Sequence, residues 1–465
     1  MIKILFFLKG LAEKLGFSVF LVLFSCSFAQ ARIPVMVGLG DSIGEGVQSA
    51  DASYRTQPNS YINLIAGQIG IRFSSPLIKS GPGAMVGDTS RRFRLFSFIA
   101  SPNLAVSGAD VNSLINDRAD AIQVEEINSE TDLVLFPRTG SQIEIVESMT
   151  PFMIVGWIGN NDVLSAVISF DQLDASQITS VSEFQAGFIE IAERLSDAGE
   201  IVVLANIPDV SSISFLVNRQ DLIKFLGSDF GLKEGDYTSI AAMFLIKLGL
   251  ADQSLIQDPD FVLDAAEIQI IQERIETFNQ IIEDVADSNG IPIVDINGLF
   301  NEITVNPPIF VDIPITPRFL GGFFSLDGVH PSNIAHAVIA NAFIETINSN
   351  FKINIPCIST EELTDIFLKD PFIDKDGDGR VRGRPGAGLL ETLAPFLGIS
   401  GDRNDSINEG FLLRADSCPR QQFIDKFLIF GKENFQMDSQ WNKKDAINAF
   451  KFIFRLKIPG GDQGW

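Results

Sequence analysis

Residues 33–46 read Ile-Pro-Val-Met-Val-Gly-Leu-Gly-Asp-Ser-Ile-Gly-Glu-Gly, and this stretch decides the fold class. Residues 33–39 form a short apolar run, which predicts a strand that is buried on both faces. The glycine-rich turn after it carries one hydroxyl, that of Ser42, and glycines allow a sharp bend and close approach of a substrate. A serine placed where a strand gives way to a helix has an N–H that can face an oxyanion. A plain turn in which Ser42 only caps the helix is the alternative.

Further apolar runs alternate with amphipathic segments along the chain. Strands are expected at residues 33–39, 152–158, 201–205 and 291–296, and helices at residues 182–198, 265–288 and 333–350. Gly199 and Gly290 stand where two of these helices should end. The alternation predicts an α/β sandwich around a parallel sheet. Residues 211–262 fit it poorly, so we expect an insertion there that acts as a lid over a site.

Composition limits the classes of function. The chain has 465 residues, of which 46% are hydrophobic, and its 35 basic and 59 acidic residues give a formal net charge of −24. Such a charge argues against binding to nucleic acid or to an anionic membrane. With 2 histidines and 3 cysteines, a zinc site of the Cys/His kind is not expected.

The first 31 residues have the features of an export signal. Three lysines precede an apolar run at residues 17–29, which is shorter than the about 20 residues that span a bilayer. Ala-Gln-Ala at 29–31 offers a small-x-small cleavage site, so residues 1–31 are predicted to be a signal peptide of a secreted or periplasmic protein. A retained anchor is one alternative. Lipid attachment at Cys26 is another, and the bulky Phe24 argues against it.

The acidity is confined to the first part of the mature chain. Residues 32–352 carry 17 basic and 41 acidic residues, whereas residues 353–465 carry 15 and 17. This change predicts a domain at residues 32–352 and a separate module at residues 353–465.

A serine nucleophile needs a base, and the sequence contains only His330 and His336. His330 lies in the loop Ser-Leu-Asp-Gly-Val-His-Pro-Ser at residues 325–332. Asp327 precedes it by three residues, which lets a turn bring the carboxylate to the imidazole and orient it. His336 falls inside the expected helix at 333–350, where a histidine is expected to pack or to face solvent.

Four blocks together resemble the GDSL family of lipases and esterases, also called SGNH hydrolases. The similarity covers about residues 33–352, and the blocks occur in the family's order. They are Gly40-Asp-Ser42, Asn-Leu-Ala-Val-Ser-Gly at 103–108, Gly-Asn-Asn-Asp at 159–162, and Asp-Gly-Val-His-Pro at 327–331.

The resemblance assigns a role to each matching residue. It makes Ser42 the nucleophile, His330 the general base and then acid, and Asp327 the residue that orients His330. The oxyanion hole would consist of the N–H groups of Ser42 and Gly108 and the side-chain amide of Asn161. The family implies a flavodoxin-like parallel sheet and acyl transfer to water without a cofactor. Related enzymes act on lipid esters, on short-chain esters and on acetyl groups of sugars.

Other residues in these blocks are expected to have supporting parts. Asp41 and Asp162 follow glycine-rich turns, where aspartate commonly bonds local backbone, so we assign them to holding the loops. The insertion contains apolar residues that could form an acyl pocket or ordinary core: Phe215, Leu216, Phe225, Leu226, Phe244 and Leu245.

The module at residues 353–465 contains a possible calcium loop. Asp374, Asp376 and Asp378 alternate as the opening ligands of such a loop do. Pro385 occupies the twelfth position, where an EF-hand has Glu. An acidic turn without calcium is the alternative reading of these three carboxylates.

A fainter copy of the loop follows at residues 434–445, each copy being preceded by a helix-like run. We therefore expect a mainly α module that resembles an EF-hand or dockerin pair and that binds a protein partner. Cys357 and Cys418 precede the two loops at nearly equal distances and are the only cysteines after residue 31, which predicts a disulfide in an exported protein.

The sequence as a whole predicts a secreted serine esterase or lipase that acts on a small-molecule, lipid or glycan ester. A secreted carbohydrate deacetylase is the first alternative. The second is an inactive protein that binds or anchors a partner through its C-terminal module. The acyl chain, the alcohol and the oligomeric state are left open.

Overall fold

The computed structural model describes residues 35–375, apart from 82–83, 169–171, 174 and 250, together with Val381. The expected signal peptide, the second calcium-type loop and Cys418 lie outside these residues, so the predictions made for them stay predictions. Among the residues described, no helix is both long and apolar enough to span a bilayer.

The centre of the fold is a parallel four-stranded sheet in the order β1-β4-β5-β9. Every residue of β1, β4 and β5 is buried, which explains why these strands are continuous apolar runs in the sequence. The strands are β1 (Met36–Gly40), β4 (Met153–Trp157), β5 (Ile201–Ala205) and β9 (Ile293–Val294).

An extended segment at residues 102–106 continues the sheet beyond β1. The N–H of Leu104 donates to Gly38 O at 2.8 Å, and that of Val106 donates to Gly40 O at 3.0 Å. The pairing of Gly38 with Asn103 is parallel. With this segment at the edge, the strand order is that of a flavodoxin-like sheet, so the expected fold class is confirmed.

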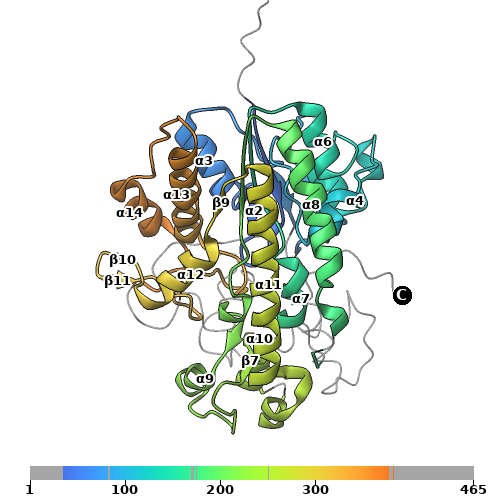
Figure 1. The fold of residues 1–465 in the computed structure, drawn as a ribbon. Helices are drawn as coiled ribbons and strands as arrows, with labels where there is room; N and C mark the ends of the chain where they lie inside the picture. The colour runs from blue at the N-terminus through green and yellow to red at the C-terminus, as the bar shows by residue number, and fades with distance from the viewer. Residues whose placement is uncertain are drawn as a thin grey trace, which may run out of the picture. The chain divides into compact units, whose positions relative to one another are not determined.

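Helices cover both faces of the sheet (Figure 1). One face is covered by α3 (Tyr61–Ile69) and α13 (Asn333–Asn350), and the other by α4 (Val111–Asn116), α6 (Gln142–Met149), α8 (Val181–Ala198) and α11 (Ala265–Asn289). The other α-helices of the described residues are α2 (Ser42–Glu45), α5 (Glu130–Leu135), α7 (Asn161–Ile168), α9 (Arg219–Leu226), α10 (Ile240–Leu248), α12 (Ile296–Val305) and α14 (Thr360–Lys369). The other strands of the described residues are β2 (Ile78–Ser80), β3 (Arg92–Arg94), β6 (Leu216–Val217), β7 (Tyr237–Ser239), β8 (Val262–Leu263), β10 (Ile309–Phe310) and β11 (Ile313–Pro314).

The predicted element ends lie within one residue of the observed ones, apart from the start of β1 at Met36 and the strand expected at residues 291–296. Gly199 and Gly290 follow α8 and α11 as expected, and Gly290 has φ +65°. The strand expected at residues 291–296 is shorter, because Asp295 caps α12: its Oδ1 accepts the N–H of Gly298 at 2.8 Å. The chain therefore turns into a helix where the apolar run alone suggested more strand.

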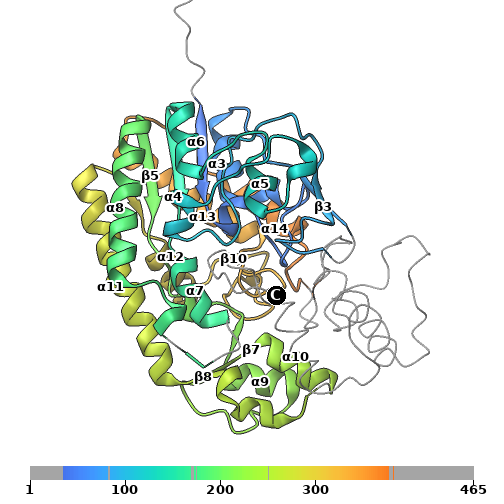
Figure 2. The same cartoon turned by 90° about the vertical axis from the view of Figure 1, so that its right-hand side faces the viewer.

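Residues 211–262 form a small subdomain with the antiparallel sheet β6-β7-β8 and the helices α9 and α10. Figure 2 shows these elements beyond the end of the parallel sheet toward which its strands run. Phe215, Leu216, Phe244 and Leu245 are buried, and Phe225 and Leu226 are partly buried against the same core. Most of the apolar residues that could have lined an acyl pocket are therefore core.

The described part of the expected tail module packs on the first domain. The ring of Phe367 in α14 stacks on Phe310 with centroids 5.6 Å apart. The N–H of Ile334 at the start of α13 donates to Asp370 Oδ2 at 2.9 Å. The change in charge near residue 352 therefore does not coincide with a break in packing.

Candidate active site

Ser42 lies where the first strand of the sheet ends. It is the first residue of α2, and Asp41 caps this helix by accepting the N–H of Ile43 at 2.9 Å. Gly40 has φ +137°, and a Cβ at this position would lie 2.2 Å from Trp157 O. Only glycine fits this close approach between the nucleophile turn and β4. The expected strand-to-helix turn is confirmed.

The structure brings Ser42, His330 and Asp327 together. Ser42 Oγ lies 2.8 Å from His330 Nε2, and His330 Nδ1 lies 2.6 Å from Asp327 Oδ2. All three side chains are buried, that of His330 completely. The two contacts form a continuous hydrogen-bonded chain from hydroxyl to imidazole to carboxylate.

Asp327 is held by backbone donors on both carboxylate oxygens. The N–H groups of Val329 and His330 donate to Oδ1 at 2.9 Å each, and the N–H of Ala50 donates to Oδ2 at 2.7 Å. Burial by itself would raise the pKa of Asp327. The adjacent imidazole and these donors outweigh it and hold the pKa below its usual range, so the carboxylate stays ionised.

The turn at Ser49 and Ala50 was not anticipated from the sequence. Both residues are buried and left-handed, with φ of +55° and +63°, which aims the Ala50 N–H at Asp327. Ser325 Oγ accepts the N–H of Ser49 at 2.8 Å and donates to Asp327 Oδ1 at 3.2 Å. Such conformations cost about 1–3 kcal/mol each for non-glycine residues, and they typically occur at functional sites.

Gly108 lies on a loop and Asn161 is the first residue of α7, and these two segments are bonded to each other. Asn161 Nδ2 donates to Ala109 O at 2.8 Å, and Asp162 Oδ2 accepts the N–H of Val111 at 3.0 Å. Gly108 has φ +81°. Within the described part of the chain, no acceptor bonds the N–H of Ser42 or of Gly108. Both N–H groups can therefore serve an incoming oxyanion.

Asp41 and Asp162 hold the loops, as predicted. Asn160 Nδ2 donates to Asp41 Oδ2 at 2.8 Å and so joins the nucleophile turn to the Gly-Asn-Asn-Asp block. Burial raises the pKa of Asp41 above its usual range. Burial and the nearby Asp110 raise the pKa of Asp162 to about 7. Neither carboxyl contacts the Ser42–His330 pair through a hydrogen bond in the described structure.

The insertion contacts the loop at residues 325–332, which carries Asp327 and His330 and is called the triad loop. The N–H of Phe215 donates to Gly328 O at 2.8 Å, and a Cβ at Gly328 would lie 2.6 Å from Phe215 N. Gly328, at φ +73°, sits between Asp327 and His330. The small subdomain is therefore attached to the backbone of the candidate site itself.

His336 lies in α13 and is completely buried, in accord with its assignment as a packing residue. It belongs to the helix that follows the triad loop, whereas His330 belongs to the loop. His330 is the histidine whose ring is hydrogen-bonded to Ser42.

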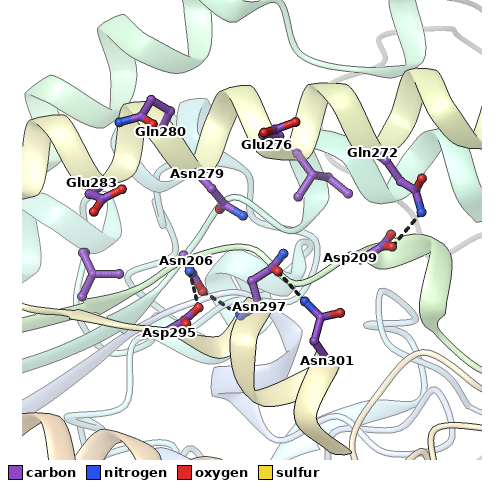
Figure 3. Close-up of a pocket in the computed structure, with 12 residues that line it drawn as sticks. Asn206, Asp209, Gln272, Glu276, Asn279, Gln280, Glu283, Asp295, Asn297 and Asn301 are labelled. Carbon is purple, nitrogen blue, oxygen red and sulfur yellow. Dashed lines mark hydrogen bonds between the residues drawn. The ribbon is translucent and has the colours of Figure 1, made fainter. Parts of the chain in front are cut away.

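A separate hollow of about 660 Å³ lies between α11 and the carboxyl ends of β5 and β9 (Figure 3). None of the three triad residues lines it. Its polar lining is made of carboxylates and amides: Asp209, Glu276, Glu283, Asp295, Asn206, Gln272, Asn279, Gln280, Asn297 and Asn301. Several of these side chains bond one another, as Asn206 Nδ2 does with Asp295 Oδ1 at 2.9 Å.

The calcium prediction is not tested by the structure. Asp374 is described, whereas Asp376 and Asp378 lie outside the described residues. In the described ranges, no three His, Cys, Asp or Glu side chains are grouped to hold a metal ion. Cys357 is exposed, and its predicted partner Cys418 lies outside the described residues, so the disulfide between them stays a prediction.

Comparison with known proteins identifies the family. A model of the GDSL-like lipase/acylhydrolase family matches residues 36–343, which contain all four blocks. The chain belongs to this family. It is accordingly a carboxylic ester hydrolase. No curated protein matches the chain.

Several solved structures resemble this GDSL-family chain at low identity. LAE5, an α/β hydrolase enzyme from the metagenome of Lake Arreo, Spain, is 14% identical, with a TM-score of 0.34 over 69% of this chain and 97% of that one. Axe2, an acetylxylan esterase from Geobacillus stearothermophilus, is also 14% identical, with a TM-score of 0.34 over 68% and 94% of the two chains.

Proposed function

We propose that this GDSL-family enzyme cleaves esters through an acyl-enzyme intermediate on Ser42. The observation that carries the proposal is the chain of contacts from Ser42 Oγ to His330 Nε2 at 2.8 Å and from His330 Nδ1 to Asp327 Oδ2 at 2.6 Å. A nucleophile within hydrogen-bond reach of a base, and a base oriented by a third group, are what this chemistry requires.

In the first half of the reaction, His330 Nε2 takes the proton of Ser42 Oγ while this oxygen attacks the ester carbonyl carbon. The carbonyl oxygen becomes negatively charged and accepts hydrogen bonds from the N–H groups of Ser42 and Gly108 and from Asn161 Nδ2. The intermediate then collapses, and His330 gives its proton to the departing alcohol oxygen. Water repeats the sequence and releases the acid, which leaves Ser42 free.

Asp327 stabilises the imidazolium that forms during both halves of the reaction. Its carboxylate accepts Nδ1–H of His330, which leaves Nε2 free to accept the proton of Ser42. The lowered pKa of Asp327 keeps it an acceptor throughout.

The formal charge of −24 supports a neutral rather than an anionic substrate. A panel of p-nitrophenyl esters of increasing chain length, with acetylated xylan beside it, would decide between a lipase, a short-chain esterase and a carbohydrate deacetylase. Hydrolysis of none of them, with a folded protein, would favour the binding role that is the remaining alternative.

Asn161→Ala should lower kcat by about 10²–10³, because one donor to the oxyanion is lost. KM should change much less, since the ground-state carbonyl binds this donor weakly. Steady-state kinetics with p-nitrophenyl acetate measures both constants. A kcat within threefold of that of the unmodified enzyme would remove Asn161 from the oxyanion hole.

Activity should rise as the pH is raised from acid to neutral, because the general base works only in its neutral form. The base must be neutral to accept the proton of Ser42, and Asp327 remains ionised across this range because its pKa is lowered. His336→Gln, compared at equal numbers of active sites, should show the same profile. A shifted or missing limb in this variant would transfer the role of base to His336.

A further inference from the structure

Glu45 is a completely buried carboxyl that the reaction does not use. It is the last residue of α2, the four-residue helix that begins with Ser42. Burial, together with the nearby Glu130, raises the pKa of Glu45 to about 8. Burying a carboxyl group costs folding free energy unless hydrogen bonds or a paired charge compensate for the lost water.

The bonds of Glu45 reach the loop that carries Gly108. The N–H of Ser107 donates to Glu45 Oε2 at 2.9 Å, and the hydroxyl of the same serine donates to the same oxygen. Ser107 directly precedes Gly108, so these two bonds restrain the residue whose carbonyl carbon is bonded to the Gly108 nitrogen. The Glu45 side chain therefore connects α2, which begins with Ser42, to the loop that carries Gly108.

The other carboxyl oxygen of Glu45 faces a buried arginine. Its Oε1 lies 3.8 Å from Nη2 of Arg92, and both side chains are fully buried. Arg92 is itself held by an ion pair with Glu130 and by a bond from Nη2 to Ala52 O at 2.8 Å. Oε2 of Glu45 is thus held by two hydrogen bonds, whereas Oε1 has no hydrogen-bond partner among the described residues and lies beside the Arg92 guanidinium.

A second contact brings α2 and the same loop together. Asn103 Nδ2 donates to Gly44 O at 2.9 Å, and a Cβ at Gly44 would lie 2.7 Å from the Cβ of Ala105. The spacing between the helix and the loop is therefore set closely along residues 103–107. Glu45 bonds Ser107, which is the end of this segment that lies next to Gly108.

We propose that Glu45 is a positioning residue of the oxyanion hole, which holds the Gly108 N–H at a fixed place relative to the Ser42 N–H. The inference rests on the proposed function of these two groups. An oxyanion hole works because its donors are placed before the charge develops. A displacement of about 1 Å can cost roughly 10²-fold in rate.

The test compares an ester with the matching thionoester, in which sulfur replaces the carbonyl oxygen. Sulfur is larger and accepts hydrogen bonds weakly, so its reaction depends little on the hole. Glu45→Ala should lower kcat for the ester by about 10–100-fold and for the thionoester by less than about threefold. Glu45→Gln should restore the ester kcat to within about threefold, because its amide oxygen can accept both Ser107 bonds. Active sites are counted with a fluorophosphonate before each measurement.

Ser107→Ala covers the case in which Glu45→Ala fails to fold. This variant removes one of the two bonds to Glu45. It should lower the ratio of kcat for the ester to kcat for the thionoester by about threefold to tenfold. Ser113→Ala is the matched control, since Ser113 is equally buried and donates its hydroxyl to Asp110 Oδ1 at 2.8 Å. This control should lower the free energy of unfolding and leave the ester-to-thionoester ratio of kcat unchanged.

Asn161→Ala distinguishes a failure of the role proposed for Glu45 from a failure of the oxyanion hole on which that role rests. One outcome is that Asn161→Ala lowers the ratio of kcat for the ester to kcat for the thionoester while the Glu45 and Ser107 variants leave it unchanged. In that case the role proposed for Glu45 is wrong and the assigned oxyanion hole is kept. If Asn161→Ala also leaves the ratio unchanged, the assigned oxyanion hole itself is wrong.

Discussion

Ser42→Ala should lower ester hydrolysis by about 10⁴-fold or more, to the level that binding and the oxyanion donors alone provide. The variant removes the oxygen that forms the acyl bond and that lies 2.8 Å from His330 Nε2. Alanine fits the helix position, so the fold should be kept. Steady-state kinetics and a thermal melt followed by circular dichroism measure the two effects.

Ser141→Ala is the matched control for this variant. Ser141 is a buried serine that caps α6, where its Oγ accepts the N–H of Glu144. Its loss should cost about 1 kcal/mol of stability and leave kcat unchanged. Retained activity in Ser42→Ala would contradict the proposed mechanism, whereas lost activity in both variants would show that the assay reports folding.

Asp327→Asn should lower kcat by roughly 10³–10⁴-fold at nearly unchanged KM. The carboxylate accepts bonds on both oxygens, from His330 Nδ1 and the Ala50 N–H on one side and from the N–H groups of Val329 and His330 on the other. An amide has only one oxygen, so its NH₂ group must face donors on one side. The imidazole then loses either its orientation or the tautomer that leaves Nε2 able to accept a proton.

Asp370→Asn is the control for replacing a buried aspartate. Asp370 is completely buried and accepts the N–H of Ile334, at the start of the helix that follows the triad loop. Its amide variant should lower the melting temperature while kcat stays within about twofold of the unmodified enzyme. If the two variants lose the same activity, Asp327 contributes only to folding.

The parts of the fold that the sequence predicted are those set by local patterns. The strands are uninterrupted apolar runs because both faces of the sheet are covered. Gly290 ends α11 in the left-handed conformation that few other residues adopt. His330 was found because the chain has only two histidines and one of them follows an aspartate. Gly108 and Asn161 came from the resemblance to the family, since no local pattern marks a donor to an oxyanion.

The parts that were missed depend on contacts between distant segments. A charged residue such as Glu45 or Arg92 is normally expected at the surface, and its burial shows only when the chain is folded. The left-handed turn at Ser49 and Ala50 contains no glycine that would announce it. The packing of α14 was hidden by the change in charge near residue 352, because one buried ring, that of Phe367, attaches a helix whose other side chains are mostly exposed.

The most direct test of the central claim is to label the enzyme with a fluorophosphonate and to locate the adduct by peptide mass spectrometry. Because only an activated serine reacts with this probe, we expect one adduct per chain, on Ser42, at a rate that falls in Asp327→Asn. Ser42→Ala should remain unlabelled. An adduct on any other serine, or full activity after complete labelling of Ser42, would contradict an acyl-enzyme at this residue.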